Sequence, residues 1–381
     1  MKEVHYDVVV CGAGVAGVAA AVAAARKGAK TVIVEKQCLL GGLATSGLIY
    51  IYLPLCDGNG KQVTYGLSEE MLRRCAEYGP FDVPEQWGGP KGGSPGISGE
   101  RYQCCFSPAG FTLTLDKMLA EAGVDLWLDT LITDARKEEN RIVAVDAVNL
   151  SGKIRIHGKC LVDATGCALT AKLAGSEVLS EVNHVTPWIM EMASDPAFYH
   201  FTESLHIRPF GEHSGEYAAE PPYDGKRVSQ FVRRTWRMMR EHYDRFSREE
   251  RKKNYPVHLP AMPQIRKFAH IDAIYNLTEA DGGKHFEHVI GTAGNWYHPD
   301  SGWEAPYEAL VPQDLDGVLA AGRCIGACGY AWEIFRAIPA ASMTGEAAGI
   351  AAALCAERNL QPKELPYELL KKELHSLPPA R

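Results

Sequence analysis

The sequence lacks the charge and the motifs on which several large classes of protein depend. Its 40 Lys and Arg residues are outnumbered by 47 Asp and Glu residues, which gives a net charge of −7 and a pI near 6.0. No basic field would therefore gather nucleic acid or an anionic membrane surface. Neither the phosphate-binding G-x-x-x-x-G-K-S/T loop nor the H-E-x-x-H helix occurs. Phosphoryl transfer and zinc proteolysis thus lack support, and we expect small-molecule partners.

The eleven cysteines form no regular framework. An odd number of scattered cysteines is atypical of secreted disulfide scaffolds and indicates a reducing compartment, so we expect a cytoplasmic protein. Cys324 and Cys328 form one closely spaced pair without a second, and Cys104 and Cys105 are adjacent, so we expect no metal site. The segment Leu39–Gly47 also lacks the C-x4-C of a redox-active disulfide.

One uncharged apolar run, Val8–Ala25, is long enough to raise the question of a membrane span. The preceding residues balance Lys2 against Glu3 and Asp7, so they do not form the positive region of a signal peptide. Three glycines within six residues also favour a turn over a continuous helix. We therefore expect no membrane span here.

The stretch from Tyr6 to Lys36 predicts a strand, a glycine turn, a helix and a second strand. Gly12, Gly14 and Gly17 have the G-x-G-x-x-G spacing, which allows a tight turn, a close approach of a pyrophosphate and close packing of helix on strand. Glu35 lies 18 residues beyond Gly17, at the end of the second strand, where its carboxylate can accept hydrogen bonds from a ribose. The segment predicts a dinucleotide site, but by itself it leaves NAD and FAD both open.

Three further stretches decide between the two dinucleotides. LLGGLATSG (Leu39–Gly47), LVDATG (Leu161–Gly166) and the segment Val318–Leu354 occur in the order seen in a known family. The chain resembles the FAD-dependent oxidoreductases of the glutathione reductase-like group and, more distantly, fumarate reductase flavoproteins. The resemblance covers roughly residues 6–50, 106–175 and 263–354. It departs from the family after LVDATG, where a Gly-Asp pair is usual and Cys167 stands here. Arg323 follows Gly322 as in this family, whereas many other flavoproteins carry Asp there.

The resemblance implies FAD as the cofactor and assigns positions to its contacts. The segment after Glu35 would pass beside the pyrophosphate and the flavin, and the position of Ile132 would touch adenine through its backbone. The predicted cofactor-binding residues are Gly12, Gly14, Ala16, Gly17, Glu35, Lys36, Gly42, Leu43, Ala44, Thr45, Ile132, Ala164, Thr165, Gly166, Gly322, Arg323, Arg336 and Ala340.

The closing segment also has a physical interpretation. A buried strand over 315–321 is turned by Gly322, and Pro339 can begin an alanine-rich helix. Amides at the start of this helix would stabilise the negative charge that grows on the flavin pyrimidine edge during reduction. The alternative is a buried helix that packs on the sheet, because small residues pack closely by themselves.

The region that should hold the substrate is poorer in motifs. Residues 54–105 contain many glycines and prolines and predict an active-site cover, in which Arg101, Tyr102 and Cys104 re-enter near the flavin, or else a mobile surface loop. Residues 228–253 predict a long helix with a solvated face rather than an anion-binding patch.

Two residues are candidates for catalysis, and two others are weaker candidates. Arg266 could hold a carboxylate or an enolate oxygen, and His298 could take the proton that accompanies hydride transfer. Tyr307 is a weaker candidate beside the cofactor, as is Arg336. Each has a structural alternative, since an Arg can pair with an acid in the core, a loop His can be satisfied locally, and an aromatic residue can simply pack.

The predicted fold class is α/β, a discontinuous Rossmann-like FAD-binding domain with a small β-meander and an inserted α+β substrate domain. The expected function is hydride transfer between a small organic substrate and flavin N5. The rivals are an NAD-dependent dehydrogenase and a flavoprotein with a lyase, isomerase or binding role. No second G-x-G-x-x-G occurs, which leaves oxygen, a quinone, another protein or a second substrate as electron partner, and a homo-oligomer stays open. The predicted domains are 1–53, 106–179 and 305–358 for FAD, 54–105 as cover, 180–304 for substrate and 359–381 as tail.

Overall fold

A seven-stranded sheet forms the centre of the protein. The computed structural model describes residues 1–59, 61–79, 82–83, 104–194, 199–200, 202, 204–210, 218–221 and 223–378. The sheet has the order β5-β2-β1-β8-β7-β6, and β19 pairs with β8 as well. Its strands are β1 (Lys2–Cys11), β2 (Thr31–Val34), β5 (Asp125–Trp127), β6 (Leu131–Glu138), β7 (Arg141–Asn149), β8 (Gly152–Asp163) and β19 (Val318–Ala320).

The long strand β8 belongs to two parts of this sheet. Its last residues pair in parallel with β1 on one side and with β19 on the other. On the far side of β1, strands β2 and β5 continue the parallel part of the sheet. Its first residues pair antiparallel with β7, which pairs antiparallel with β6, so these three form the expected meander. The sequence predicted the meander to begin near Val124, but β5 instead extends the parallel sheet beside β2. The predicted fold class, a Rossmann-like sheet with a meander, is confirmed.

The parallel part of the sheet is buried on both faces, which explains its continuous apolar strands. In β1, Val8 and Val10 join the core on the helix side, while Val9 and Cys11 join a second core with the meander. This alternation follows from the two-residue period of a strand. The one apolar strand β1 therefore contributes side chains to both hydrophobic cores, one on each face of the sheet.

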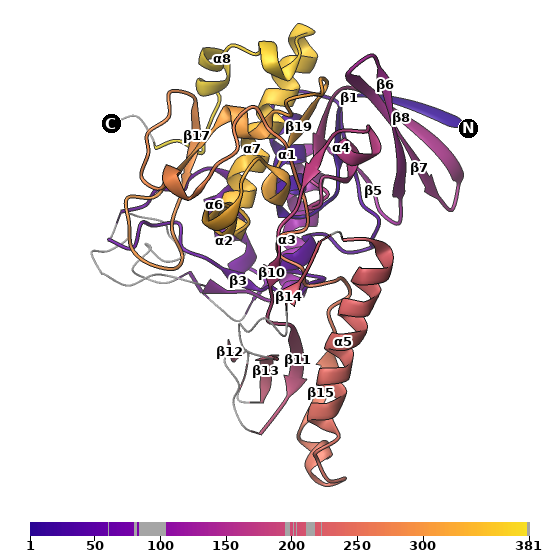
Figure 1. Ribbon diagram of the computed structural model, residues 1–381, viewed down its shortest axis with the longest axis vertical. Helices are drawn as coiled ribbons and strands as arrows, with labels where there is room; N and C mark the ends of the chain where they lie inside the picture. Colours follow the sequence, from indigo (N-terminus) through magenta and orange to yellow (C-terminus); the bar gives the residue numbers. More distant parts are fainter. Residues whose placement is uncertain are drawn as a thin grey trace.

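Two helices from opposite ends of the chain cover the helix side of the sheet. They are α1 (Val15–Arg26) and α7 (Ile338–Arg358), which lie against one another in Figure 1, indigo beside yellow. A Cβ placed on Gly345 would lie 2.2 Å from the carbonyl oxygen of Ala16, and one on Gly349 would lie 2.1 Å from that of Ala20. The two backbones therefore touch, and only glycine fits there.

The apolar character of these helices is explained by burial. Among the described residues, Ile338–Arg358 is the one helix with the length and apolarity to cross a bilayer, and its apolar stretch is wholly buried inside the protein. The run from Val8 is divided into β1, a turn and α1, as the three glycines predict.

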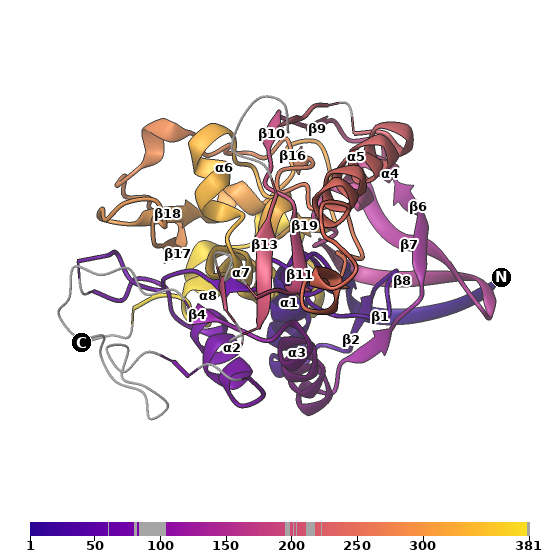
Figure 2. The same ribbon diagram turned by 90° about the horizontal axis from the view of Figure 1, so that it is seen from below.

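The inserted region forms a separate lobe, seen at the lower end of Figure 1 and from below in Figure 2. A sheet of order β12-β13-β11-β15 lies beside helix α5 (Gly225–Tyr243). Asp224 begins α5 by accepting a hydrogen bond from the Arg227 amide (2.8 Å). The helix ends ten residues earlier than predicted because Ser247 and Glu250 bond one another's amides and begin a new turn. The strands are β11 (Trp188–Met192), β12 (Tyr199–His200), β13 (Leu205–Pro209) and β15 (Tyr255–His258).

The remaining elements connect these parts. The C-terminal segment, predicted as a tail, packs on the fold, where the Tyr367 hydroxyl donates to the carbonyl of Val289 (2.6 Å). The remaining α-helices of the described residues are α2 (Leu67–Ala76), α3 (Pro108–Ala122), α4 (Leu169–Leu173), α6 (Gly329–Phe335) and α8 (Tyr367–Lys371). The remaining strands pair two by two, β3 (Ile51–Tyr52) with β4 (Cys104–Cys105), β9 (Val178–Leu179) with β16 (His270–Ile271), β10 (Asn183–His184) with β14 (Ala218–Ala219), and β17 (Val289–Ala293) with β18 (Trp303–Pro306).

Candidate cofactor and substrate site

A cleft of about 970 Å³, counted with its open mouth, lies at the carboxyl edge of the parallel strands. Its walls come from the segments that follow β1, β2, β8 and β19, together with the start of α7 and residues 262–266. Open α/β sheets bind their ligands at this edge. The chain thus brings segments from both of its ends to one cleft.

The three glycines of the first turn play different roles, and of these Gly12 and Gly14 line the cleft while Gly17 does not. Gly12 has a φ of +95°, and a Cβ there would lie 2.8 Å from the carbonyl oxygen of Ala164. A Cβ on Gly17 would lie 1.9 Å from the carbonyl oxygen of Gly12, so this glycine permits the helix to approach the turn. Gly14 lines the cleft, and a Cβ there would meet no protein atom within 4 Å. The space in front of Gly14 is therefore open to a ligand.

Glu35 directly follows β2, beside this turn, and is buried. Its Oε2 accepts a hydrogen bond from the Ala13 amide (2.8 Å) and its Oε1 accepts one from the Gln37 amide (3.0 Å). The Thr130 amide donates to the Glu35 carbonyl oxygen (3.0 Å), which brings the start of the meander to this corner. Ile132 lies two residues further on, with its side chain in the core under the meander and not in the cleft wall.

The second glycine-rich segment crosses in front of the first turn. The Gly41 amide donates to the Ala13 carbonyl oxygen (2.8 Å), and Gly41 forms an isolated parallel β-bridge with Gly14. The buried Thr45 hydroxyl donates to the Leu40 carbonyl oxygen and so closes the loop, but Thr45 itself does not line the cleft. The predicted residues of this segment that do line it are Lys36, Gly42, Leu43 and Ala44.

The turn after β8 is organised by one fully buried carboxylate. Asp163 accepts hydrogen bonds from the amides of Thr165 (3.1 Å), Thr170 (2.8 Å) and Ala171 (3.1 Å), and from the Thr165 hydroxyl (2.7 Å). Burial raises the pKa of Asp163, while these hydrogen bonds oppose that rise. The turn holds Ala164, Thr165 and Gly166 in the cleft wall.

The closing segment brings the C-terminal part of the chain to the same cleft. Gly322 follows β19 with a φ of +67°, and its amide donates to the Thr344 hydroxyl (3.0 Å) of α7. Gly322, Arg323 and Arg336 line the cleft. Ala340 is buried in the first turn of α7 behind the wall, whereas its neighbours on the helix, Ala337, Ile338 and Ala341, line it.

The catalytic candidates are not all brought together, since only Arg266 and Arg336 line the cleft. Arg266 lines the cleft. His298 is exposed in a loop, 3.4 Å from the Tyr330 hydroxyl, and lies outside the cleft wall. Tyr307 is buried, and its hydroxyl donates to the carbonyl of Pro362 (3.0 Å).

The predicted cover over the cleft is described only in part. Arg101 and Tyr102 lie outside the described residues, while Cys104 is buried in β4, paired with β3. The catalytic roles of Arg266, His298 and Tyr307, and the cover, therefore stay predictions.

The cleft also has an apolar wall that the sequence interpretation did not name. It comes from Ile49, Ile51, Leu53 and Met262. These residues stand in two apolar segments of the sequence, the run after Gly47 and PAMPQIR. Nothing in the sequence indicated that the two segments meet in one wall of the cleft. The cleft thus combines the backbone amides of the turn at Gly14, open space in front of that turn, and an apolar wall. This combination fits a dinucleotide that carries a flat ring system.

Comparisons with known proteins agree with this geometry. A digeranylgeranylglycerophospholipid reductase of Picrophilus torridus is 30% identical over 168 residues, 43% of this chain and 40% of that protein. A thioredoxin reductase of Ureaplasma parvum is 40% identical over 72 residues, 19% of this chain and 23% of that protein. These matches span less than half the length of either relative.

Solved structures share the fold over nearly the whole chain. A geranylgeranyl bacteriochlorophyll reductase-like protein of Thermoplasma acidophilum has a TM-score of 0.50 at 15% identity and covers 98% of this chain and 85% of its own. A p-nitrophenol 4-monooxygenase of Pseudomonas putida has a TM-score of 0.51 at 12% identity and covers 98% and 84%. The sequence profile of FAD dependent oxidoreductases matches residues 7–186 and 211–374, and the chain therefore belongs to the FAD dependent oxidoreductase family.

Proposed function

We propose that this chain transfers a hydride between a small organic substrate and N5 of FAD held in the cleft. The observation that carries the proposal is the convergence of the first glycine turn, the turn after β8 and the start of α7 on one cleft. FAD, when bound, supplies the site that accepts or releases the hydride. The protein would bind, orient and shield the reacting groups.

The backbone amides of the first turn would hold the pyrophosphate. They stand at the amino end of α1, where partial positive charge favours an anion, and Gly14 leaves the approach open. Glu35 already orients the turn through the Ala13 amide, and its remaining acceptor capacity suits a ribose hydroxyl.

The amino end of α7 supports a place for the flavin pyrimidine edge. Ala337, Ile338 and Ala341 line the cleft there, and Pro339 in the first turn has no amide of its own to satisfy. Free amides at a helix start stabilise negative charge that develops during reduction. The apolar wall opposite would exclude water from the ring.

The remaining partners are proposed on sequence grounds. The electron partner is oxygen, a quinone, another protein or a second substrate, since the sequence has one G-x-G-x-x-G only. All eleven cysteines are free, which supports a cytoplasmic location.

Colour and anaerobic bleaching test the proposal. The purified protein should be yellow, and an anaerobic screen of metabolites should find at least one that bleaches the visible flavin band. A colourless protein that binds NAD instead would overturn the cofactor assignment. A yellow protein that no metabolite reduces, and that turns over a substrate without bleaching, would indicate a lyase, an isomerase or a binding protein.

His298 remains our candidate for proton transfer. We expect His298→Ala to slow flavin reduction by about tenfold or more while FAD stays bound, because positioned acid–base groups contribute about 10²–10⁴-fold. His258→Ala, an exposed histidine of β15, is the matched control. Rapid-mixing absorbance measures both rates, and an unchanged rate for His298→Ala would remove it from the mechanism.

A further inference from the structure

Arg266 is a cation without an acidic partner of its own. Its Nη1 donates to the Gln264 carbonyl oxygen (3.2 Å), and its guanidinium lies 5.3 Å from the centre of the Trp188 ring. Among the described residues no carboxylate forms an ion pair with Arg266, and Glu333, which pairs with Lys267 and Arg336, acts on it through its charge alone. A guanidinium in a cleft wall with only a carbonyl and an aromatic ring as partners has donors left for a ligand.

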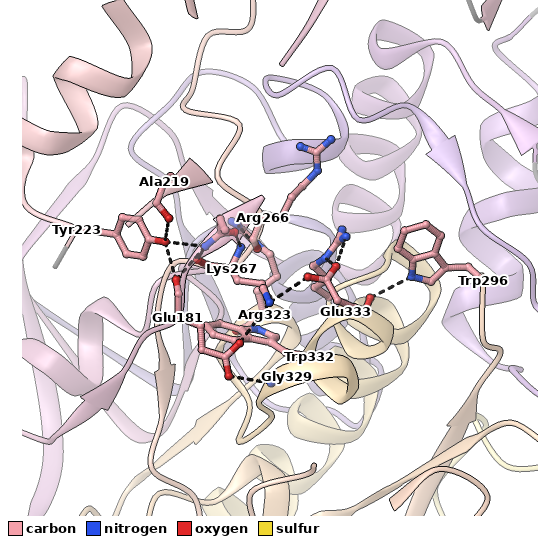
Figure 3. A network of polar contacts seen from close by, with 12 residues as sticks. Glu181, Ala219, Tyr223, Arg266, Lys267, Trp296, Arg323, Gly329, Trp332 and Glu333 are labelled. Atoms are coloured by element: carbon pink, nitrogen blue, oxygen red, sulfur yellow. Dashed lines mark hydrogen bonds and ion pairs between the residues drawn. The ribbon is translucent and has the colours of Figure 1, made fainter. Parts of the chain in front are cut away.

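The charges around Arg266 are unbalanced. Glu333 pairs with Arg336 (Nε to Oε2, 2.6 Å) and with Lys267 (3.0 Å), and Lys267 also pairs with Glu181 (3.2 Å). Figure 3 shows Lys267 with Glu181 and Glu333, beside Arg266 and Arg323. Of the four cations in this part of the described structure, Lys267 and Arg336 pair with these two carboxylates, and Arg266 and Arg323 do not.

Arg323 fixes the segment that carries Arg266. Its Nη1 donates to the carbonyl oxygens of Ile265 (2.9 Å) and Arg266 (3.2 Å). Arg323 therefore positions the backbone of Arg266. Desolvation, and then the charge of Arg336, lower the pKa of Arg266 to about 9, so a bound anion would relieve an existing electrostatic cost.

Arg266 belongs to a different wall of the cleft from the first turn. The pyrophosphate would lie on the amides of the first turn, whereas Arg266 lies where the cleft meets the inserted lobe, because its partner Trp188 begins β11. Met262, four residues before Arg266, belongs to the apolar wall of the cleft. A ligand reaching Arg266 from the cleft would place an apolar part against this wall.

Resting on the proposed function, we infer that the substrate is a small carboxylate, with its carboxyl group held by Arg266 and with Arg336 beside it. The planar guanidinium offers two parallel donors that match the two oxygens of a carboxylate. The apolar wall would then hold the carbon that exchanges the hydride. Selection of an anion at this end would reject neutral analogues of the same shape.

Titration of the flavoprotein with simple anions tests this inference. We expect acetate and succinate to perturb the visible flavin spectrum in a saturable way, and acetamide and succinamide not to do so. Arg266→Met should keep its FAD and bind succinate at least about tenfold more weakly, because hydrogen bonds to charged groups are the stronger kind. Arg266→Lys should recover part of the affinity, since it restores the charge without the fork.

Arg237→Met, at an exposed position of α5, is the matched control and should bind succinate as the unaltered protein does. Equal affinity of Arg266→Met and the unaltered protein would overturn the inference, as would a response to inorganic phosphate with none to carboxylates. Loss of FAD from Arg266→Met would overturn it too, because the guanidinium would then serve the cofactor. If the unaltered protein binds no FAD, the proposed function itself is refuted. If it binds FAD but is reduced by neutral substrates alone, only the inference of a carboxylate substrate is refuted.

Discussion

Gly14 and Gly17 lie three residues apart in the same turn, yet they are glycine for opposite reasons. Gly14 has ordinary backbone angles, with a φ of −68°, and faces open space, so only a ligand would need the absence of its side chain. A Cβ on Gly17 would lie 1.9 Å from the Gly12 carbonyl oxygen, so the protein itself needs the absence of that side chain.

Substitutions should separate these two reasons. We expect Gly14→Leu to lose bound FAD while the stability of the apoprotein changes by less than about 0.5 kcal/mol, as for a side chain in free space. Gly17→Ala should lower the free energy of unfolding by about 1–3 kcal/mol, because the new methyl overlaps the backbone. Urea unfolding of the apoproteins and the flavin-to-protein absorbance ratio measure the two effects. FAD retained by Gly14→Leu at the level of the unaltered protein would contradict the site.

Glu346 is a second residue whose surroundings set its chemistry. It is buried within α7, where it accepts hydrogen bonds from the amides of Leu67 (2.6 Å) and His375 (3.2 Å). Burial raises the pKa of its carboxyl group to about 7; the charge of Glu70 adds to this rise, and the two amides and Arg26 oppose it. The carboxyl group thus joins α7 to the start of α2 and to the C-terminal segment.

The raised pKa of Glu346 makes stability depend on pH. A carboxyl whose pKa is higher in the folded than in the unfolded protein favours folding when it is protonated, so its contribution is complete below about pH 4.5 and is lost as the pH rises to about 7. The loss is roughly 3 kcal/mol, since one pKa unit corresponds to about 1.4 kcal/mol. Urea unfolding at pH 5, 6, 7 and 8 should show this slope in the unaltered apoprotein but not in Glu346→Gln. Equal slopes for the two proteins would show that another group titrates.

At the scale of elements, the contact between α1 and α7 joins the two ends of the chain. Inside an isolated helix, replacing glycine by alanine stabilises by about 1 kcal/mol. At Gly349 we expect the opposite sign, a loss of about 1–3 kcal/mol, because the methyl would meet the Ala20 carbonyl oxygen. Gly225→Ala, at the exposed start of α5 with no atom within 4 Å of the new Cβ, is the control and should be nearly neutral. Thermal and urea unfolding distinguish the two signs.

The elements that carry local signals could be predicted from the sequence. The first strand, the glycine turn, α1 and β2 follow from spacing and caps, and the helix after Pro339 begins where that proline indicates. Helix α5 is longer in the prediction because its charged periodicity continues past Tyr243, while the reciprocal bonds of Ser247 and Glu250 start a new turn.

What could not be predicted depends on contacts between distant segments. The pairing of β5 with β2, the apolar wall that combines Ile51 with Met262, and the unbalanced charge of Arg266 all require knowledge of which segments meet. Short strands carry little register information, and a lone Arg looks the same in sequence whether it pairs with an acid or with a ligand. The assignments of His298 and Tyr307 as catalytic residues rested on a resemblance in sequence order, which does not fix distance to the cleft.

At the scale of the whole molecule, a ligand in this cleft would connect segments that are far apart in the sequence. Anything that binds the folded chain alone stabilises it, by about 2.7 kcal/mol at a free concentration 100 times Kd. We therefore expect FAD added to the apoprotein to raise the melting temperature in a concentration-dependent manner, and NAD at the same concentration to have little effect. Differential scanning fluorimetry measures both, and an equal shift with NAD would favour a dehydrogenase.

The packing of α7 on α1 has a consequence for the synthesis of the protein. Ala16 and Ala20 emerge from the ribosome more than 300 residues before Gly345 and Gly349, the residues that will cover them. At roughly 5–20 residues per second, the amino-terminal apolar segment waits on the order of 15–60 s for its partner. During synthesis the nascent chain therefore presents an alanine-rich surface that chaperones can hold, and the nucleotide fold closes only after α7 has been synthesised.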